Sequence, residues 1–511
     1  MVTGFVPVAI FIWTFLHCYG IVKKKLYEVT FMHANKLAGL APESVFYYFE
    51  QLCAIPHGSG NTKPISDYLV AFAKEQNLRY IQDAANNVIL FGDATPGYED
   101  HLPVILQGHM DMVCEKDEDC PIDMDVQGLD IAHDGKYVFA NGTTLGGDNG
   151  IAVAYALAIL ADRSIPHPPL EVIITVDEEI GMLGADVIDL SMLKGRTLLN
   201  MDSEEEGIFT VACAGGATAT VTLPAPRHPV YGPCIKLSVD GLQGGHSGVE
   251  IHKNLANANK VMGELLSRVR EVMPFCLTSF SGGAKDNAIP RSCHVTAVML
   301  GMNPERINDI TQQLQKEIRE KYDEPEAVIT GDNVEALGGN AISTELTDKV
   351  IALLCGAPNG VQKMSEDIEG LVQTSLNLGI ANLNEDLKLT FSVRSSVNTE
   401  KLELLERLQK LASIHDASYS QMGDYPAWEY KADSHLRDTM VKVYREMYGT
   451  EAQIVAIHAG LECGLLSEKL PGLDCVSIGP EMHDIHTSRE RLGIASVKRT
   501  WEFILEILRR L

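Results

Sequence analysis

The feature that most constrains this chain is a run of carboxylates at the end of an apolar segment. Residues 172–176 read Val-Ile-Ile-Thr-Val and are followed directly by Asp177-Glu-Glu179. A short apolar and β-branched run is typical of a buried strand. Adjacent carboxylates at its end repel one another, and buried charges persist only when they are paired or bind a metal. A solvated acidic turn is the alternative, but other segments supply further ligands, so we prefer a divalent metal.

A histidine and a carboxylate follow a second predicted strand. Residues 104–107 read Val-Ile-Leu-Gln, and His109 and Asp111 come directly afterwards. The carboxyl ends of strands are the usual ligand sites in open α/β sheets. Residues two apart in an extended chain share a face, so Asp111 can hold the far ring nitrogen and fix its tautomer. A lone histidine would more often be structural, but this pairing favours a metal ligand with an orienting neighbour.

Two more carboxylates end comparable segments. Asp148 lies in Gly142-Thr-Thr-Leu-Gly-Gly-Asp-Asn-Gly150, before an apolar helix predicted over residues 151–160. It is either a helix N-cap or part of a site, and a glycine-rich loop that lets the backbone approach a ligand favours the site. The loop lacks the Gly-Lys-Ser/Thr of a phosphate cradle. Asp202 closes another short apolar strand and is a fourth candidate ligand.

The last polar cluster lies near the C-terminus. His458 and Glu462 follow one apolar segment, and His483 and His486 follow another. If a ligand from this cluster meets His109, the region between them must be an insertion in one α/β domain. Strands alternating with helices predict that domain over residues 40–215 and 425–511. Recurring strand–helix pairs over residues 216–424 predict an inserted α+β domain of two similar lobes.

Residues 1–26 form a separate apolar segment. The run at 4–22 is just long enough to span a bilayer, but Pro7 and His17 interrupt it and no basic residue precedes it. Two interpretations stay open: an anchor that keeps the protein on the cytoplasmic side because three lysines follow, or an extension with no role in the fold. A cleaved signal peptide is less favoured.

Composition excludes several partners. The net charge of −27 argues against nucleic acid or an anionic membrane and fits cationic or zwitterionic small substrates. The 11 cysteines are scattered, with no pair at the spacing of a thiolate zinc site, which indicates reduced thiols in a cytoplasmic protein.

Together the motifs resemble the M20 metallopeptidases, and most closely the aminoacyl-histidine dipeptidases (Xaa-His or beta-alanyl-histidine dipeptidases). The match runs from about residue 44 to the C-terminus, so the apolar N-terminus lies outside it. The motifs that carry it are Gly108-His-Met-Asp-Met-Val113, Leu145-Gly-Gly-Asp-Asn-Gly150, Asp177-Glu-Glu-Ile-Gly181, Gly244-Gly-His-Ser-Gly248, Asn287-Ala-Ile-Pro-Arg291, Thr374-Ser-Leu-Asn-Leu-Gly379 and His458-Ala-Gly-Leu-Glu-Cys-Gly464.

The resemblance implies a zinc-peptidase catalytic domain, with a mixed twisted sheet flanked by helices, and an inserted lid or dimerisation domain. It also implies two zinc ions per subunit, for which Mn²⁺ or Co²⁺ can substitute. Asp111 would orient the first histidine and Glu178 would be the general base. The last ligand stays open between His483 and His486, and the Thr-Ser after His486 fits the family better. The implied ligands are His109 and Asp202 for one metal, Glu179 and His486 for the other, and Asp148 as the bridge.

This ligand set suits peptide hydrolysis. Two metals about 3.5–4 Å apart can share a water, lower its pKa toward ~7 and polarise the scissile carbonyl. Glu178 would take the proton of the water and return it to the leaving amine. Adjacent residues at a strand end point in different directions, so Glu179 can bind metal while Glu178 acts as base.

The resemblance also implies substrate contacts. In related enzymes the equivalent of His246 reaches the active site of the partner subunit and stabilises the oxyanion, an effect of ~3–4 kcal/mol for other such donors. Asn287 and Arg394 are candidates for binding the terminal carboxylate, which an arginine fork suits; a surface strand residue is the alternative for Arg394. Glu462 and His458 would line the pocket.

We therefore expect a cytoplasmic di-zinc dipeptidase that hydrolyses Xaa-His (carnosine-like) and other unblocked dipeptides, as a homodimer through the inserted domain. An N-acyl amino acid deacylase or a tripeptidase is the alternative. A non-catalytic metal-binding scaffold ranks below both, because Glu178 and every ligand type are present. We expect no nucleic-acid partner, and membrane contact only through residues 4–22.

Overall fold

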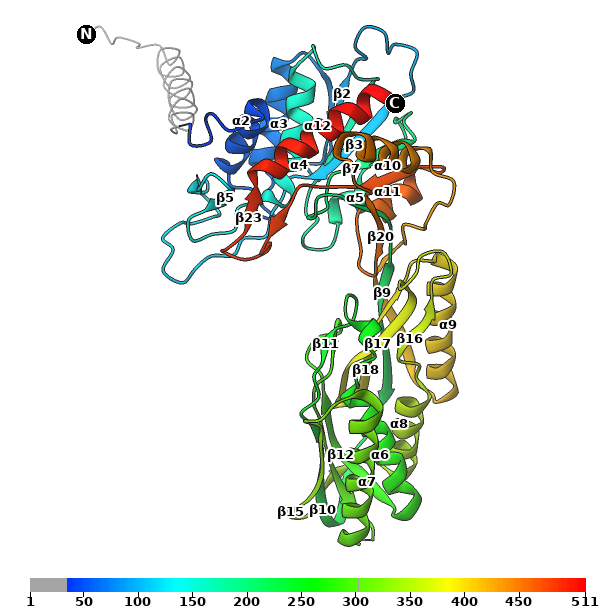
Figure 1. Cartoon of the computed structure of the whole chain (residues 1–511). Helices are drawn as coiled ribbons and strands as arrows, with labels where there is room; N and C mark the ends of the chain where they lie inside the picture. Colours follow the sequence, from blue (N-terminus) through cyan, green and yellow to red (C-terminus); the bar gives the residue numbers. More distant parts are fainter. Residues whose placement is uncertain (1–34, 302) are drawn as a thin grey trace, which may run out of the picture. The chain divides into compact units, whose positions relative to one another are not determined.

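The computed structural model describes residues 35–301 and 303–511, so the apolar run at 4–22 lies outside the described residues. The chain forms two compact units (Figure 1). Within the described ranges, no helix has the length and apolar character needed to cross a membrane. Of the described residues, the first unit comprises 35–208, Asp438–Ala452 and Ser477–Leu511, and the second comprises those within Phe209–Arg437 and Gln453–Val476.

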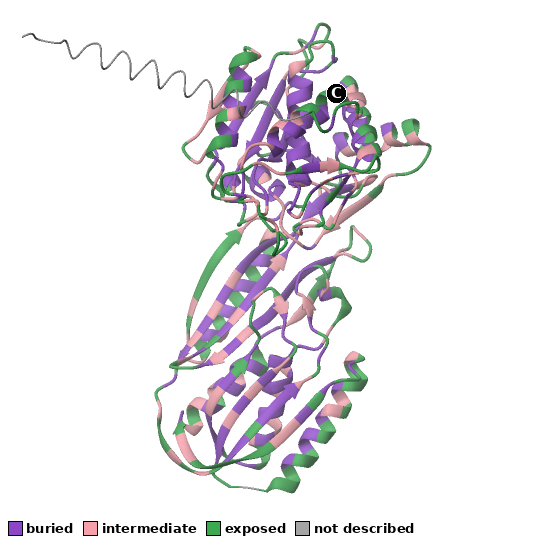
Figure 2. Cartoon of the chain, turned by 90° about the vertical axis from the view of Figure 1, so that its left-hand side faces the viewer, coloured by how far each residue is buried: buried purple, intermediate pink, exposed green. Residues whose placement is uncertain are grey.

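Five neighbouring strands of a mixed eight-stranded sheet form the centre of the first unit, in the order β1-β2-β6-β3-β7. Strand β3 runs parallel to β6 and β7, whereas β2 is antiparallel to β1 and β6. Strands β2, β3 and β6 are buried along their whole length (Figure 2), as their apolar sequences predict. The bounds are β1 Arg79–Gln82, β2 Val88–Gly92, β3 Val104–His109, β6 Leu170–Thr175 and β7 Thr197–Asn200.

Helices flank this sheet. Helix α4 packs on β3 and α2 and is buried almost throughout, because its sequence is apolar on every face. Helix α12 buries one face only, which includes Trp501 and Ile504. The prediction of a mixed sheet flanked by helices is confirmed. The bounds are α2 Glu43–Cys53, α3 Lys63–Glu75, α4 Gly147–Ala161, α5 Leu183–Val187, α10 His435–Tyr448 and α12 Ile494–Arg510.

A smaller sheet, in the order β22-β23-β5-β4, also belongs to the first unit. Its strands are β4 Ile131–His133, β5 Tyr137–Ala140, β22 Met482–His483 and β23 Arg491–Gly493. It holds the segment that follows β22 next to residues from the first third of the chain, since β23 pairs with β5.

The second unit is built on one antiparallel sheet in the order β15-β10-β14-β12-β17-β18-β9-β19, with β16 paired to β17. The two predicted lobes share this sheet, because β12 of one half pairs with β17 of the other. One apolar core runs through both halves. The strands are β9 Gly215–Pro224, β10 His228–Asp240, β12 Phe275–Gly282, β14 Cys293–Met299, β15 Val328–Ala341, β16 Gly360–Met364, β17 Val372–Leu383, β18 Asp386–Ser395 and β19 Ser418–Tyr425.

Four long helices and a short ribbon complete this unit. Helix α6 packs on α7 and α8, and α9 packs on β9, β18 and β19. The helices are α6 Ala258–Val272, α7 Pro304–Tyr322, α8 Thr344–Gly356 and α9 Asn398–Ile414, and the ribbon is β11 Gly245–His246 with β13 Ala288–Ile289. The remaining elements are β8 Ile208–Cys213, η1 Ile251–Lys253, β20 Gln453–Ile457, α11 Cys463–Lys469 and β21 Asp474–Ser477.

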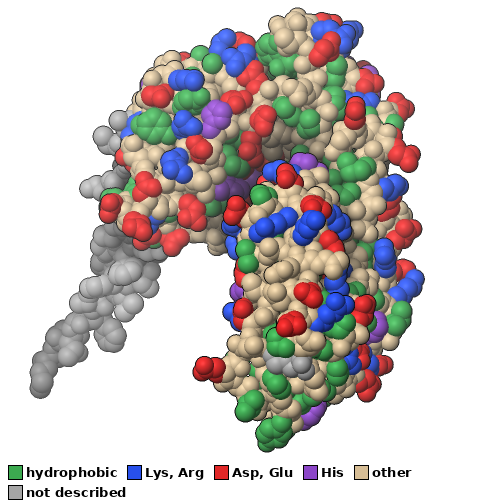
Figure 3. Space-filling view, turned by 60° about the horizontal axis from the view of Figure 1, so that its bottom comes forward, with side chains coloured by type: hydrophobic (Ala, Val, Ile, Leu, Met, Phe, Trp, Pro, Cys, Tyr) green, Lys and Arg blue, Asp and Glu red, His purple; other side chains and the backbone are tan. Residues whose placement is uncertain are grey.

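The distribution of charged side chains on the surface is consistent with the net charge of −27. Acidic side chains are spread over the visible face and basic ones stand among them (Figure 3). The cysteines that the structure describes are all free.

Candidate metal centre and substrate-binding residues

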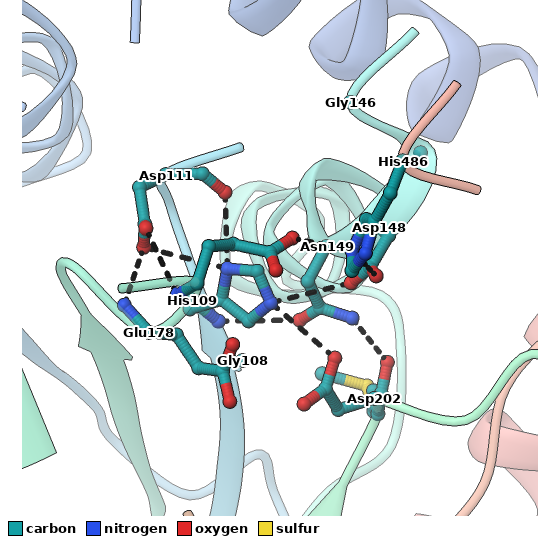
Figure 4. A network of polar contacts seen from close by, with 12 residues as sticks. Gly108, His109, Asp111, Gly146, Asp148, Asn149, Glu178, Asp202 and His486 are labelled. Carbon is teal, nitrogen blue, oxygen red and sulfur yellow. Dashed lines mark hydrogen bonds and ion pairs between the residues drawn. The ribbon is translucent and has the colours of Figure 1, made fainter. Parts of the chain in front are cut away.

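Carboxylates and imidazoles gather where the parallel strands of the first unit end (Figure 4). His109 is the last residue of β3, Glu179 follows β6 and Asp202 follows β7. Asp148 comes from the first turn of α4, and His486 follows β22. Because parallel strands end at the same edge of a sheet, residues far apart in the sequence meet there.

Asp148 lies between the two histidines. Its Oδ1 is 3.2 Å from His109 Nε2, and its Oδ2 is 3.2 Å from His486 Nε2. His109 Nε2 also lies 3.5 Å from Asp202 Oδ1, and His486 Nε2 lies 3.0 Å from Glu179 Oε1. The donors therefore form two groups that share Asp148, and within each group the donor atoms lie within 4.8 Å of one another.

Asp111 contacts both His109 and the acidic segment after β6. His109 Nδ1 lies 3.0 Å from the Asp111 carbonyl oxygen, which can only accept, so the Nδ1 carries the proton and Nε2 is left as a ligand atom. The Asp111 carboxylate accepts the Ser59 hydroxyl at 2.8 Å and the backbone N–H of Glu178 at 3.1 Å. It thereby fixes both the imidazole and the acidic segment after β6.

Glu490 supports Asp148, and no sequence signal marks it. Its buried carboxylate accepts the backbone N–H groups of Leu145 at 2.8 Å and Gly146 at 3.2 Å on one oxygen. The other oxygen accepts those of Gly147 at 2.7 Å and Asp148 at 3.3 Å. The N-cap position of α4 is occupied by Gly146, in a left-handed conformation, so Asp148 is not the N-cap that sequence reasoning allowed.

The pKa values of the cluster reflect its crowded negative charge. Burial alone would lower the pKa of His109, but Asp202, Asp111 and Asp148 together raise it well above its usual range. Hydrogen bonds to Asp148 and Glu179 raise the pKa of His486 to about 10. Burial raises the pKa of Asp202 to about 6. Such a set calls for added positive charge, and its imidazole and carboxylate donors suit Zn²⁺ or a similar divalent ion.

Two residues near the predicted ligands, His483 and Asp177, are in none of the donor groups. His483 packs its ring against Tyr137, with centroids 5.6 Å apart, so the structure brings His486 and not His483 to the cluster. Asp177 turns away and accepts the backbone N–H of Gly60 at 2.7 Å. Glu178 lies in a third donor group with His109 and Glu179.

The second unit brings together several predicted substrate-binding residues. Arg394 of β18 lies opposite Ser375 of β17, whose hydroxyl is 2.7 Å from His458 Nε2. The Arg394 guanidinium lies 3.4 Å from the Tyr425 hydroxyl and has no acidic partner among the described residues; its Nε is buried without a hydrogen-bond partner. Burial, with the nearby Arg394 charge, lowers the pKa of His458 to about 3. An unpaired guanidinium of this kind suits an anionic ligand.

The remaining candidates lie in the same unit. His246 is in β11, and burial and the Arg394 charge lower its pKa. The carbonyl oxygen of Asn287 accepts the backbone N–H of Ser247 at 2.9 Å, so this contact ties Asn287 to the His246 loop through its backbone. Glu462 is buried directly before α11.

Comparison with known proteins agrees with this chemistry. The model of peptidase family M20/M25/M40 matches residues 105–510. The cytosol non-specific dipeptidase of Escherichia coli (strain K12) is 36% identical over 484 residues, 93% of this chain and 99% of that protein. An aminoacylhistidine dipeptidase structure from Vibrio alginolyticus is 36% identical, covers 94% of this chain and 99% of its own, and has a TM-score of 0.88.

A tripeptidase structure from Staphylococcus aureus is more distant. It is 16% identical with a TM-score of 0.54, over 92% of this chain and 98% of its own, and shares the fold alone. The family resemblance inferred from the motifs is confirmed by the family model and by the two relatives at 36% identity. The chain belongs to peptidase family M20/M25/M40.

Proposed function

We propose that this protein is a di-zinc dipeptidase that hydrolyses unblocked dipeptides, those ending in histidine included. The observation that carries the proposal is the pair of donor groups that share Asp148. The two relatives at 36% identity, a non-specific dipeptidase and an aminoacylhistidine dipeptidase, support the dipeptide substrate. A cytoplasmic location and a homodimer belong to the same proposal, as does the functional division into residues 40–215 with 425–511 and an inserted domain at 216–424.

The proposed ligands are those that the distances group together. His109 and Asp202 would hold one zinc ion, Glu179 and His486 the other, and Asp148 would contact both. Such ions, when bound, polarise a carbonyl and lower the pKa of a water.

Glu178 would act as the general base. Its backbone N–H donates to Asp111, which fixes its main chain, and its carboxylate lies in the donor group with His109 and Glu179. It would take a proton from the attacking water and pass it to the leaving amine, a role that a carboxylate next to the ligands can perform. Arg394 would bind the terminal carboxylate of the peptide, and His246 would donate a hydrogen bond to the oxyanion.

The test is hydrolysis by the purified protein of a panel of carnosine, other Xaa-His dipeptides, non-histidine dipeptides, tripeptides and N-acyl amino acids, with zinc content measured in parallel. We expect turnover of dipeptides and about two metal ions per chain. Turnover confined to tripeptides or N-acyl amino acids would favour the alternative activities. Metal binding without any turnover would favour a scaffold.

A further inference from the structure

Asp177 is the first of the three adjacent carboxylates after β6, and it belongs to none of the donor groups that the described residues form. Its φ of 53° lies in the left-handed region, which few residues other than glycine adopt. In an extended strand, adjacent side chains point to opposite faces. Glu178 and Glu179 nevertheless each have an oxygen within 4.8 Å of one ring nitrogen of His109. The turn at Asp177 therefore brings two adjacent carboxylates to one centre.

Backbone contacts close the loop that contains this turn. The buried side chain of Asn87 joins its two ends: Asn87 accepts the backbone N–H of Val176 at 3.1 Å and donates to the carbonyl oxygen of Gly184 at 3.1 Å. The backbone N–H of Leu183 donates to the carbonyl oxygen of Asp177 at 3.0 Å. None of these contacts uses the Asp177 carboxylate, so a residue without a side chain at this position can close the same loop.

The Asp177 carboxylate instead bonds to a segment far away in the sequence. Its Oδ1 accepts the backbone N–H of Gly60 at 2.7 Å. The preceding residue, Ser59, donates its hydroxyl to Asp111 at 2.8 Å, and Asp111 accepts the backbone N–H of Glu178 at 3.1 Å (Figure 4). Two neighbouring residues therefore hold the acidic turn at two points. Hydrogen bonds to a carboxylate are among the stronger ones in proteins, so they fix the direction of the turn.

We propose that Asp177 is a positioning residue that orients Glu178 and Glu179 toward the same metal centre. The inference rests on the proposed dipeptidase function, in which Glu178 is the base and Glu179 a ligand. The left-handed backbone of Asp177 sets the direction in which the next two residues leave the strand, and the bond to Gly60 maintains it. Each of the three adjacent carboxylates then has its own role, as anchor, base and ligand.

Replacing Asp177 by glycine separates this role from folding. Glycine adopts a positive φ without steric cost, so Asp177→Gly should unfold at a denaturant concentration close to that of the wild type, although it loses the bond to Gly60. We expect its zinc affinity, measured against a competing chelator, to fall about 10- to 100-fold, as when other groups that orient a metal ligand are removed. Its kcat should fall as well, and the absorption spectrum of the Co²⁺-loaded protein should change. Asp177→Asn keeps an acceptor oxygen and should restore the zinc affinity and the spectrum.

The matched control is Asp416→Gly. Asp416 has a similar left-handed backbone, with a φ of 57°, and its carboxylate bonds to Lys349 at 2.7 Å in the second unit. Its glycine variant should keep the wild-type zinc affinity, spectrum and kcat.

Three results would overturn the inference: wild-type zinc affinity and spectrum in Asp177→Gly, an equal loss in Asp177→Asn, or a glycine variant that does not fold. The last would show that the fold itself needs the carboxylate. Wild-type protein that binds no zinc and hydrolyses no dipeptide would instead refute the proposed function.

Discussion

Replacing Glu490 by glutamine tests how Glu490 supports the Asp148 loop without changing any proposed metal ligand. Glutamine keeps the shape of the side chain, but only one terminal atom can accept. Each Glu490 oxygen now accepts two backbone N–H groups from residues 145–148. The new NH₂ group would therefore face two N–H donors in a buried site.

The magnitude follows from those two lost acceptor contacts. A buried donor left unsatisfied costs about 1–3 kcal/mol, so Glu490→Gln should lower the free energy of unfolding by about 2–6 kcal/mol. The displaced loop should also weaken metal binding by about 10- to 100-fold, the usual effect of removing a group that orients a metal ligand.

Glu171 provides a matched control. It is a buried glutamate in the same unit, and its carboxylate accepts the backbone N–H groups of Lys194 and Gly195, the latter at 2.9 Å. Glu171→Gln should also destabilise the fold but leave metal affinity unchanged. The assays are thermal unfolding of the metal-free proteins and zinc titration against a competing chelator. Equal zinc affinity in both variants and the wild type would refute the supporting role of Glu490.

Three other predictions concern single residues. Glu178→Gln should keep its metal content and lose about 10²- to 10⁴-fold in kcat; unchanged turnover would exclude the base. His486→Asn should lower the zinc content measured by atomic absorption, whereas His483→Asn should not, and the reverse result would reassign the last ligand. Because the folded pKa of His458 is about 3 and its ordinary value is 6.5, the unfolded chain binds its proton first as the pH falls. Stability should therefore drop by up to about 1.4 kcal/mol per pH unit below about pH 6.5. A His458→Gln variant with the same slope in denaturant melts would contradict this.

The positions of the proposed ligands at strand ends were predictable, because an apolar run predicts a buried strand and the residues after it lie at the end of that strand. His109, Glu179 and Asp202 all follow such strands. His486 could not be separated from His483 by sequence alone, since no periodic pattern in the sequence around them shows that His483 ends a short strand and His486 follows it. Only the pairing of β22 and β23 decides which of the two faces the cluster.

The role of Glu490 could not be predicted from the sequence, for a different reason. Its hydrogen-bond partners are backbone N–H groups more than 300 positions earlier in the chain. Every residue except proline has such a group, so the residue types at those positions do not reveal the contact. The recurring strand–helix pairs predicted over residues 216–424 are present in the second unit, for example β14 Cys293–Met299 followed by α7 Pro304–Tyr322. The single sheet that joins its two halves depends on the pairing of β12 with β17, which no local pattern encodes.

The wide spacing of the donors along the chain also orders events during biosynthesis. His486 lies in the last segment of the first unit, Ser477–Leu511. A nascent polypeptide on the ribosome exposes His109 and Asp148 long before that segment emerges from the exit tunnel. Cation loading at the complete centre must therefore wait until that segment has emerged, and a shorter nascent chain would carry Asp148 and Glu179 without the histidine of their donor group.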